Sequence, residues 1–304
     1  MLNKYKYRNE EWVDINSGTP EEIQGVMADY SIHPFVAKEL ISATRKPRIE
    51  FHNGHIYCIL HFPAFKHTHN GESNQEVDFV IGKNVLITAR YDTIDALHKF
   101  GKLLEVNEIL EKDHLDESEN RIFINMLKTL YNSIFDELEY IEDSIDDITK
   151  QIFKGKEREM VESISKMTRT LLEFKHSLDL HKDVLETLIH RGKDLLGENF
   201  AKNMDSIMLD YLKITSTIST QLEILRELRS TNNSMLTTKQ NEIMKQMTVL
   251  GFIILPLNLI AWVFAMRTEG MPIVDNPNAF WIVVGLMVTS ALIALAWVKH
   301  KKWI

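Results

Sequence analysis

Residues 241–266 read NEIMKQMTVLGFIILPLNLIAWVFAM, and this stretch decides the fold. From Val249 to Met266 it contains no charged residue, and Asn258 is its only strongly polar side chain. A helix rises about 1.5 Å per residue, so a helix of this length crosses a hydrocarbon core of roughly 30 Å. The stretch therefore predicts a transmembrane helix over about residues 248–266.

A second uncharged apolar run lies at 279–298, after a polar loop at 267–278. Two spans that close form a hairpin, so both flanks lie on the same side of the membrane. Lysines precede the first span and a basic tail, 299–304, follows the second, and the positive-inside rule places such flanks in the cytoplasm. We therefore expect a multi-pass protein of the cell membrane with both termini cytoplasmic. The alternative, a pair of buried core helices, is disfavoured because soluble cores rarely need two uncharged runs of this length.

One face of the first span carries its polar side chains. Steps of three or four residues place side chains on one helix face. Such steps connect Asn241, Met244, Thr248, Gly251, Leu255, Asn258 and Trp262. Met247, next to Thr248, is included in the same set. Polar residues at membrane depth face protein or water in preference to lipid. This set, the candidate pore face, therefore either packs against other helices through Asn258 or lines a pore.

Short motifs follow one another in a set order through residues 232–304. The chain has NEIMKQMT at 241–248, LPLNLIAW at 255–262, Met-Pro at 271–272 and Lys-Trp-Ile at 302–304. In this order they resemble the CorA family of divalent-cation channels, which has Asn-Glu-Val-Met-Lys, Leu-Pro-Leu-Thr-Leu-Ile-Ala, Met-Pro-Glu and Lys-Trp-Leu. The resemblance implies a funnel-shaped homopentamer with an α/β N-terminal cytoplasmic domain, a long helical stalk and two transmembrane helices.

The chain departs from that family at the family's signature. Where the family has Tyr-Gly-Met-Asn, this chain has Phe264, Ala265, Met266 and Arg267, and Glu269 follows two residues later. The family's Asn binds the hydrated cation, whereas Arg267 has only hydrogen-bond donors and stays charged. The expected selectivity mouth is thus Ala265, Met266, Arg267 and Glu269. Three orientations of Arg267 are open: its side chain faces the pore axis, pairs with a carboxylate of the loop, or reaches the lipid headgroups.

Composition limits the other function classes. The 304 residues carry a net charge of -8 at pH 7, which argues against a general nucleic-acid role. The single cysteine, Cys58, excludes an intrachain disulfide framework and a cysteine-based metal cluster, and we interpret it as a buried inert thiol. No phosphate loop, nucleophile elbow or paired His-Glu motif indicates an enzyme. The N-terminus has no apolar segment typical of a signal peptide.

Residues 1–120 predict the cytoplasmic α/β domain. Runs rich in β-branched residues predict strands at 12–15, 49–51, 56–62, 77–81 and 85–88. Asn53-Gly54 predicts a hairpin turn between the second and third of these. Three helices are expected in this domain. The first begins at Thr19-Pro20, the second runs from His33 to near Arg45, and the third runs from Asp95 to Leu104.

A group of histidines in this domain invites a zinc-site interpretation. Its members are His52, His55, His61, His67 and His69. His67 and His69 have no acidic partner beside them, and His55 and His61 lie at opposite ends of a strand. We therefore interpret all of them as ordinary surface histidines.

Residues 121–198 predict a cytoplasmic acidic helical hairpin with breaks at Gly155, Gly192 and Gly197. Its second helix is expected from Glu157 to Asp194. A coiled-coil seam in the first helix is predicted by Ile134, Leu138, Ile141, Ile145 and Ile148. Acids between 136 and 147 form either a solvated face or, by the resemblance, a cation-attracting surface. The resemblance places that surface beside a basic ring of Lys299, Lys301 and Lys302, which otherwise serve topology and interface anchoring.

Residues 199–266 predict one continuous stalk helix of roughly 90 Å, because no proline precedes Pro256. Its partner-facing stripe consists of Met204, Met208, Tyr211, Thr215, Ile218, Leu222 and Leu225. The resemblance implies regulatory Mg²⁺ sites between cytoplasmic domains, and Asp205 and Asp210 are the candidate ligands. We expect no cofactor besides the transported or regulatory cation, and the expected partners are further copies of this chain and the lipid bilayer.

Two functions remain. The first is a divalent-cation channel for Mg²⁺ or another ion such as Co²⁺, with passive flux gated by cytoplasmic cation binding. Asn241 and Asn258 offer carbonyl oxygens to a hydrated Mg²⁺, and Met244, Met247 and Leu255 offer apolar constrictions. The second is a non-conducting or regulatory membrane scaffold that keeps the family's fold, which the altered signature favours. Trp262, where the family usually has Gly, either narrows the pore or turns toward a neighbouring helix.

Overall fold

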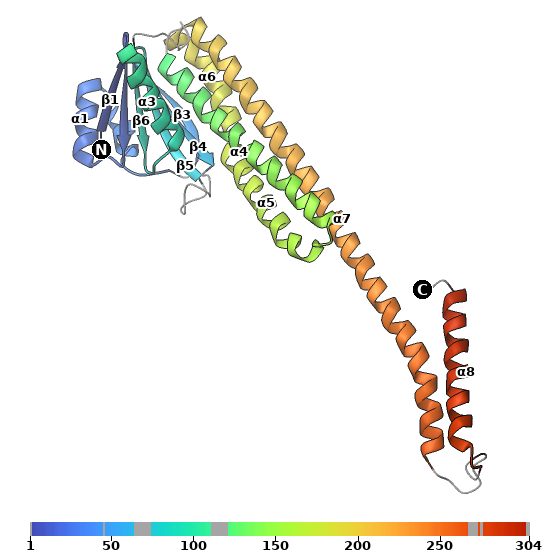
Figure 1. The fold of residues 1–304 in the computed structure, drawn as a ribbon. Helices are drawn as coiled ribbons and strands as arrows, with labels where there is room; N and C mark the ends of the chain where they lie inside the picture. Colours follow the sequence, from blue (N-terminus) through green and yellow to red (C-terminus); the bar gives the residue numbers. More distant parts are fainter. Residues whose placement is uncertain are drawn as a thin grey trace. The chain divides into compact units, whose positions relative to one another are not determined.

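The computed structural model describes residues 2–44, 46–63, 74–110, 121–266, 273 and 276–301. The chain divides into an N-terminal unit, Met1–Arg229, and a C-terminal unit, Ser230–Ile304. One helix, α7 (Glu198–Ala265), belongs partly to each unit (Figure 1). The finer functional division at residues 120, 198 and 266 stays a prediction.

A six-stranded sheet forms the centre of the N-terminal unit, in the order β1-β2-β6-β5-β4-β3. Its strands are β1 (Leu2–Tyr7), β2 (Glu10–Asn16), β3 (Arg48–His52), β4 (His55–Pro63), β5 (Asn74–Gly82) and β6 (Val85–Arg90). Neighbouring strands are antiparallel, except that β2 and β6 are parallel. The strands predicted from β-branched runs are confirmed as β2 to β6. Asn53-Gly54 forms the predicted turn, and Gly54 has a φ of 89°, which only glycine adopts without steric cost.

Strand β1 has no counterpart among the predicted strands. Its sequence, LNKYKY, alternates polar residues and pairs on one side only, with β2 at the sheet edge. Lysines are typical of such edge strands. The ring of Tyr5 stacks on that of Trp12, with centroids 4.6 Å apart. This contact with the neighbouring strand, rather than a local apolar pattern, holds β1 in place.

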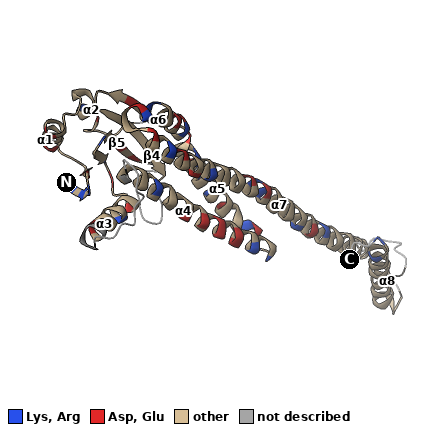
Figure 2. Ribbon diagram, turned by 90° about the horizontal axis from the view of Figure 1, so that it is seen from above, with Lys and Arg blue, Asp and Glu red and all other residues tan. Residues whose placement is uncertain are grey.

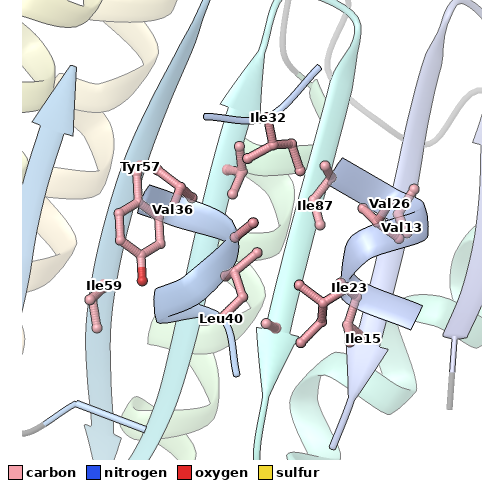
Figure 3. Close-up of a cluster of buried hydrophobic side chains, with 13 residues drawn as sticks. Val13, Ile15, Ile23, Val26, Ile32, Val36, Leu40, Tyr57, Ile59 and Ile87 are labelled. Atoms are coloured by element: carbon pink, nitrogen blue, oxygen red, sulfur yellow. The ribbon is translucent and has the colours of Figure 1, made fainter. Parts of the chain in front are cut away.

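Helices α1 (Pro20–Tyr30) and α2 (Pro34–Glu39) cover one face of the sheet. Figure 3 shows the buried cluster between these helices and the strands, which includes Val13, Ile15, Ile23, Val26, Val36, Leu40, Tyr57, Ile59 and Ile87. Thr19 caps α1 as predicted. Its hydroxyl oxygen accepts the backbone N–H of Glu22 at 3.3 Å, and the Glu22 carboxylate accepts that of Thr19 at 3.0 Å.

Helix α2 ends at Glu39, so the expectation of a helix to near Arg45 was wrong. The backbone N–H of Thr44 donates to both carboxylate oxygens of Glu76, at 2.9 and 2.7 Å. A continuing helix would need that N–H for the carbonyl of residue 40. The contact with β5 therefore competes with continuation of the helix. It cannot be predicted from the residues around Thr44, because Glu76 is far away in the sequence.

A helical layer covers the opposite face of the sheet. It consists of α3 (Asp95–Leu110), α4 (Arg121–Phe153), α5 (Glu157–Leu178), α6 (His181–Leu196) and the first part of α7. Phe79 of β5 meets Phe123 of α4 with ring centroids 5.5 Å apart, and Phe123 meets Phe200 of α7 at 6.1 Å. The predicted seam of α4 is confirmed, since all of its residues are buried, namely Ile134, Leu138, Ile141, Ile145 and Ile148.

The expected single helix from Glu157 to Asp194 is two helices, α5 and α6, separated at Asp179 and Leu180. This expectation was wrong, and so was the break expected at Gly192, which lies inside α6. A Cβ at Gly192 would come within 2.8 Å of Cε1 of Phe200, so the glycine permits close packing and does not end the helix. Gly155 and Gly197 do separate helices, each with a φ of 91°.

The interpretation of all the histidines as surface residues was also wrong. His55 and His61 are buried, with 8% and 7% of their surfaces exposed. Among the described residues, no group of three or more His, Cys, Asp or Glu is placed to hold a metal ion. His67 and His69 lie outside the described residues. Cys58 is buried as predicted, and burial raises the pKa of its thiol.

A buried hydrogen-bond relay joins α4, α6 and β4. The Nε2 atom of His181 lies 2.9 Å from the carbonyl oxygen of His61, so Nε2 carries the proton and donates. Nδ1 then accepts the hydroxyl proton of Tyr131, at 2.9 Å. Burial lowers the pKa of His181 to about 3, which keeps the ring neutral near pH 7. The relay fills both ring nitrogens and fixes how the helical layer sits on the sheet.

Tyr131→Phe removes the donor to His181 and leaves a buried nitrogen without a partner. We expect it to lower the free energy of opening of β4 by about 1–3 kcal/mol. Native-state hydrogen exchange of the β4 amides in the detergent-solubilised protein measures this. Tyr140→Phe on the same helix, whose side chain is exposed, should change it by less than about 0.5 kcal/mol. Equal effects of the two substitutions would show that the relay does not stabilise the layer contact.

Candidate functional site

The C-terminal unit contains the end of α7 and helix α8 (Ala279–His300). Both are long and apolar enough to cross a membrane, with mean hydropathies of 2.2 and 2.3 over their most apolar windows. Only 6% of each window is buried within the chain. Helix α7 continues through Pro256, as predicted. Two largely uncovered apolar helices of this kind are suited to lipid and to contacts with other chains.

Helix α8 packs against one side of α7. Val249 is buried and Ile253 and Ile260 are half-buried, and these positions follow helical spacing. The ring of Phe252 stacks on Trp297 of α8, with centroids 4.9 Å apart and planes 18° apart. Among the described residues of the C-terminal unit, α8 is therefore the partner of α7, and it covers one side of that helix.

The candidate pore face lies on roughly the opposite side of α7, since a helix turns about 100° per residue. All of its residues are exposed, and Leu255 and Trp262 reach 70% and 68%. A Cβ built at Gly251 meets no atom within 4 Å. The structure thus brings the whole predicted set together on one face that no other part of the described chain covers.

This face alternates polar and apolar groups along its length. Asn241 and Asn258, 17 residues apart, present amide groups about 25 Å apart along the helix. The Thr248 hydroxyl donates to the carbonyl of Met244 at 2.8 Å, so its oxygen keeps lone pairs for an outside donor. Met244 and Met247, 61% and 66% exposed, supply apolar surface between the asparagines. Such a face can contact a hydrated ion through oxygen atoms and exclude water at the methionines.

The expected selectivity mouth is only partly described. Ala265 is the last residue of α7, and Met266 follows it with an exposed side chain. Arg267 and Glu269 lie outside the described residues, so the orientation of Arg267 stays a prediction.

The two candidate regulatory acids lie near the start of α7. Asp205 is exposed, while Asp210 is half-buried and lies 3.9 Å from the ammonium of Lys213. Asp210 lies five positions after Asp205, which places the two acids about 140° apart around the helix. One chain therefore does not bring them together, and a site that uses both needs a second copy.

The expected acidic surface and basic ring are seen in part. Figure 2 shows acidic residues along α4, and the exposed ones are Asp136, Glu139, Glu142, Asp143, Asp146 and Asp147. Lys299 and Lys301 are exposed at the end of α8, and the Lys301 ammonium lies 5.8 Å from the centre of the Trp297 ring. Lys302 lies outside the described residues. The ring itself, like the pairing of the acids with it, stays a prediction.

A groove on the N-terminal unit was not expected from the sequence. Its volume is about 500 Å³, and its lining residues are Glu142, Leu209, Leu212, Lys213, Ser216, Thr217, Thr220, Gln221 and Ile224. Leu209, Leu212 and Ile224 are exposed. They form a second stripe on α7, beside the buried stripe that includes Met204 and Ile218. The spacing of residues 209, 212, 216, 220 and 224 could have indicated this second helix face in the sequence. The polar residues at 216 and 220 interrupt its apolar pattern, so it was not recognised.

Comparisons with known proteins agree with this architecture. The model of the family described as CorA-like Mg²⁺ transporter protein matches residues 10–300. The chain is 25% identical over 296 residues to the cobalt/magnesium transport protein CorA of Thermotoga maritima, covering 96% of this chain and 83% of that protein. It is 23% identical over 293 residues to the protein of the same name from Methanocaldococcus jannaschii, covering 96% and 91%.

The fold is similar to that of the complete CorA magnesium transporter structure from Methanocaldococcus jannaschii. The TM-score is 0.83 at 22% identity, and the match covers 100% of this chain and 95% of that one. The expected fold class is confirmed: an N-terminal α/β domain, a long helix and two apolar candidate spans. The five-fold assembly stays a prediction.

If the candidate pore face is wetted, Leu255→Cys should react with a charged, membrane-impermeant thiol reagent about tenfold or more faster than Leu250→Cys. Both side chains are exposed in the single chain, but Leu250, five positions before Leu255, lies about 140° away around α7. The buried Cys58 gives a silent background. Reagent incorporation into the protein in lipid bilayers, followed by mass spectrometry, measures the two rates. Equal rates would mean that the candidate pore face meets lipid or protein.

Proposed function

This chain belongs to the CorA-like Mg²⁺ transporter family, and from that membership we propose that it carries divalent cations, Mg²⁺ or Co²⁺, across the cell membrane. The family consists of transporters, which confirms the expectation that the chain is not an enzyme. The observation that carries the proposal is the uncovered polar face of α7, in a chain that matches its family from residue 10 to 300.

We propose that five copies place their candidate pore faces around one axis. Flux is passive, along the gradient. The amide oxygens of Asn241 and Asn258 contact the hydrated ion, which sheds its waters reluctantly. Met244, Met247 and Leu255 form apolar rings that gate by wetting and dewetting. Both termini are cytoplasmic, on the strength of the positive-inside rule.

The groove that includes Leu209 and Leu212 supports self-association. Burying a leucine contributes about 1.5–3 kcal/mol, so uncovered leucines on a helix favour a second chain over water. A neighbouring copy of α7 offers the same apolar stripe. Assembly also resolves the separation of Asp205 and Asp210, since Asp205 of one copy and Asp210 of the next can share a cation. We propose that such a shared cation stabilises the closed state.

A non-conducting scaffold remains the second candidate because of the signature. Arg267 stands where the family has the asparagine that contacts the hydrated cation. Five guanidinium groups facing the axis repel a divalent ion, and one charge pair at 4 Å is worth about 4 kcal/mol at an effective dielectric constant of about 20. Pairing with Glu269 removes much of this repulsion, as does salt at the pore mouth. Measured transport distinguishes the two functions.

Purified protein in liposomes should take up Mg²⁺ or Co²⁺ down a gradient, as followed with an internal cation-sensitive dye. Ala265→Gly/Arg267→Asn should raise the initial rate of Mg²⁺ uptake by about tenfold or more, which corresponds to about 1.4 kcal/mol of lost repulsion. Ala265→Gly alone is the matched control. Equal rates for wild type and the double variant would place Arg267 off the axis or in an ion pair. Absence of uptake by every variant would support the scaffold.

The protein in mild detergent should have the mass of a homopentamer by native mass spectrometry. Leu209→Glu/Leu212→Glu places charges in the groove and should shift most of the protein to smaller species, because a buried charge needs a partner. Leu172→Glu, at an exposed leucine of α5 that does not line the groove, should leave the pentamer intact. A monomeric wild type would contradict the assembly, and intact pentamers of the double variant would move the contact elsewhere.

A further inference from the structure

Three histidine rings stack against one another in the N-terminal unit. His33 is the N-cap of α2, His52 ends β3 and His55 begins β4. The ring centroids of His33 and His52 are 4.8 Å apart with planes 21° apart, and those of His52 and His55 are 5.3 Å apart with planes 24° apart. This histidine stack joins the start of α2 to the β3–β4 hairpin.

The histidine stack is suited to neutral rings. Nδ1 of His33 accepts the backbone N–H of Phe35 at 3.3 Å, which a proton on Nδ1 would prevent. Nε2 of the buried His55 has no hydrogen-bond partner among the described residues. Burial lowers the pKa of His55, and the neighbouring rings of His52 and His33 lower it further. Protonation of adjacent rings would place like charges about 5 Å apart, where they repel each other. His33 is exposed and His52 half-buried, so water screens this repulsion least at the buried His55.

The chain that follows α2 is held by a contact that protonation strengthens, whereas protonation weakens the histidine stack. The Glu76 carboxylate accepts the backbone N–H and the hydroxyl proton of Thr44, and it lies 3.0 Å from Nε2 of His61. Nε2 of His61 also lies 2.9 Å from the carbonyl oxygen of Thr44. Burial opposes a charge on His61, but the Glu76 carboxylate and the Thr44 carbonyl outweigh it and raise the pKa of His61. A proton on His61 therefore strengthens this end.

The charged groups around the histidine stack do not neutralise it evenly. Glu50 lies 3.3 Å from His52, but it also pairs with Arg48 at 3.5 Å, and Arg48 pairs with Glu39 at 2.6 Å. Two further charges lie on the neighbouring elements. Lys38 is on α2, and Lys83 is in the turn after β5, next to Gly82, the residue that lies opposite His55 in the β4–β5 ladder. Arg191 of α6 stacks on Phe51, whose side chain points to the other face of the sheet. Asp78, also on the His61 side, is buried, and burial beside Glu76 raises its pKa.

We propose that residues 33–44 form a proton-responsive segment whose α2 end is released by acid while its Thr44 end remains attached to β5. The stack contact, whose His55 has a folded pKa below that of the unfolded chain, is complete above about pH 6.5 and weakens as the pH falls. The His61 contact has the opposite sign, because its folded pKa is raised. It is complete below about pH 6.5 and is lost as the pH rises through the raised value. Between pH 7.5 and 5.5 the two ends therefore respond in opposite directions.

Hydrogen exchange of the full-length protein in lipid nanodiscs at pH 7.5 and 5.5 tests the segment. Protection factors divide out the intrinsic pH dependence of exchange. Those of the α2 amides, residues 37–40, should fall roughly tenfold on acidification, as expected for a newly formed like-charge contact. The protection factor of the Thr44 amide should stay constant or rise. Unchanged protection of α2, or a parallel loss at Thr44, would overturn the proposal.

His52→Phe keeps a flat ring in the middle of the stack and removes its proton, so α2 protection should then vary less than about threefold with pH. His98→Asn, at an exposed histidine of α3, is the matched control and should behave as wild type. If His52→Phe alters the protein at pH 7.5, the wild-type comparison of α2 with Thr44 still decides the question. A full acid response in a correctly folded His52→Phe protein would mean that another group senses the proton.

Discussion

The uncharged helical segments of the C-terminal unit impose the constraint on which the rest of the structure depends. Backbone groups in hydrocarbon must be satisfied within the segment, so both segments are helices. Helix α8 covers one side of α7 through Val249 and the Phe252–Trp297 stack, and the candidate pore face remains uncovered. That face places Asn241 and Asn258 where lipid is a poor partner. This uncovered face is the reason for proposing that further copies surround an aqueous path.

Helix α7 serves different partners along its length. In the N-terminal unit its Met204 and Ile218 are buried in the helical layer, and Leu209 and Leu212 on an adjacent stripe are exposed. In the C-terminal unit, α8 occupies one face and the candidate pore face takes another. Each face has its own helical periodicity, and polar positions between apolar ones separate them. One helix thereby connects the packing of the α/β domain to the proposed pore without a break in its described residues.

The N-terminal unit uses buried histidines as structural groups with different protonation states. His181 is neutral because burial inside the helical layer disfavours its charged form, and Tyr131 and a backbone carbonyl fill its two nitrogens. His61 gains a carboxylate and favours its charged form, while His55 is buried beside two other rings and disfavours it. The residue type is the same in each case, and the neighbours decide its chemistry.

The sequence by itself determined the elements that depend on local patterns: the two spans, strands β2 to β6, the Thr19 cap, the α4 seam and the candidate pore face. Apolar periodicity and helix capping depend on residues close together in the sequence, so they can be recognised before the fold is known. Only the tertiary structure decided the end of α2, the continuation of α6 through Gly192, and the burial of His55 and His61. These depend on Glu76, Phe200 and neighbouring strands far away in the chain, which compete with local preferences and can be known only when distant segments meet.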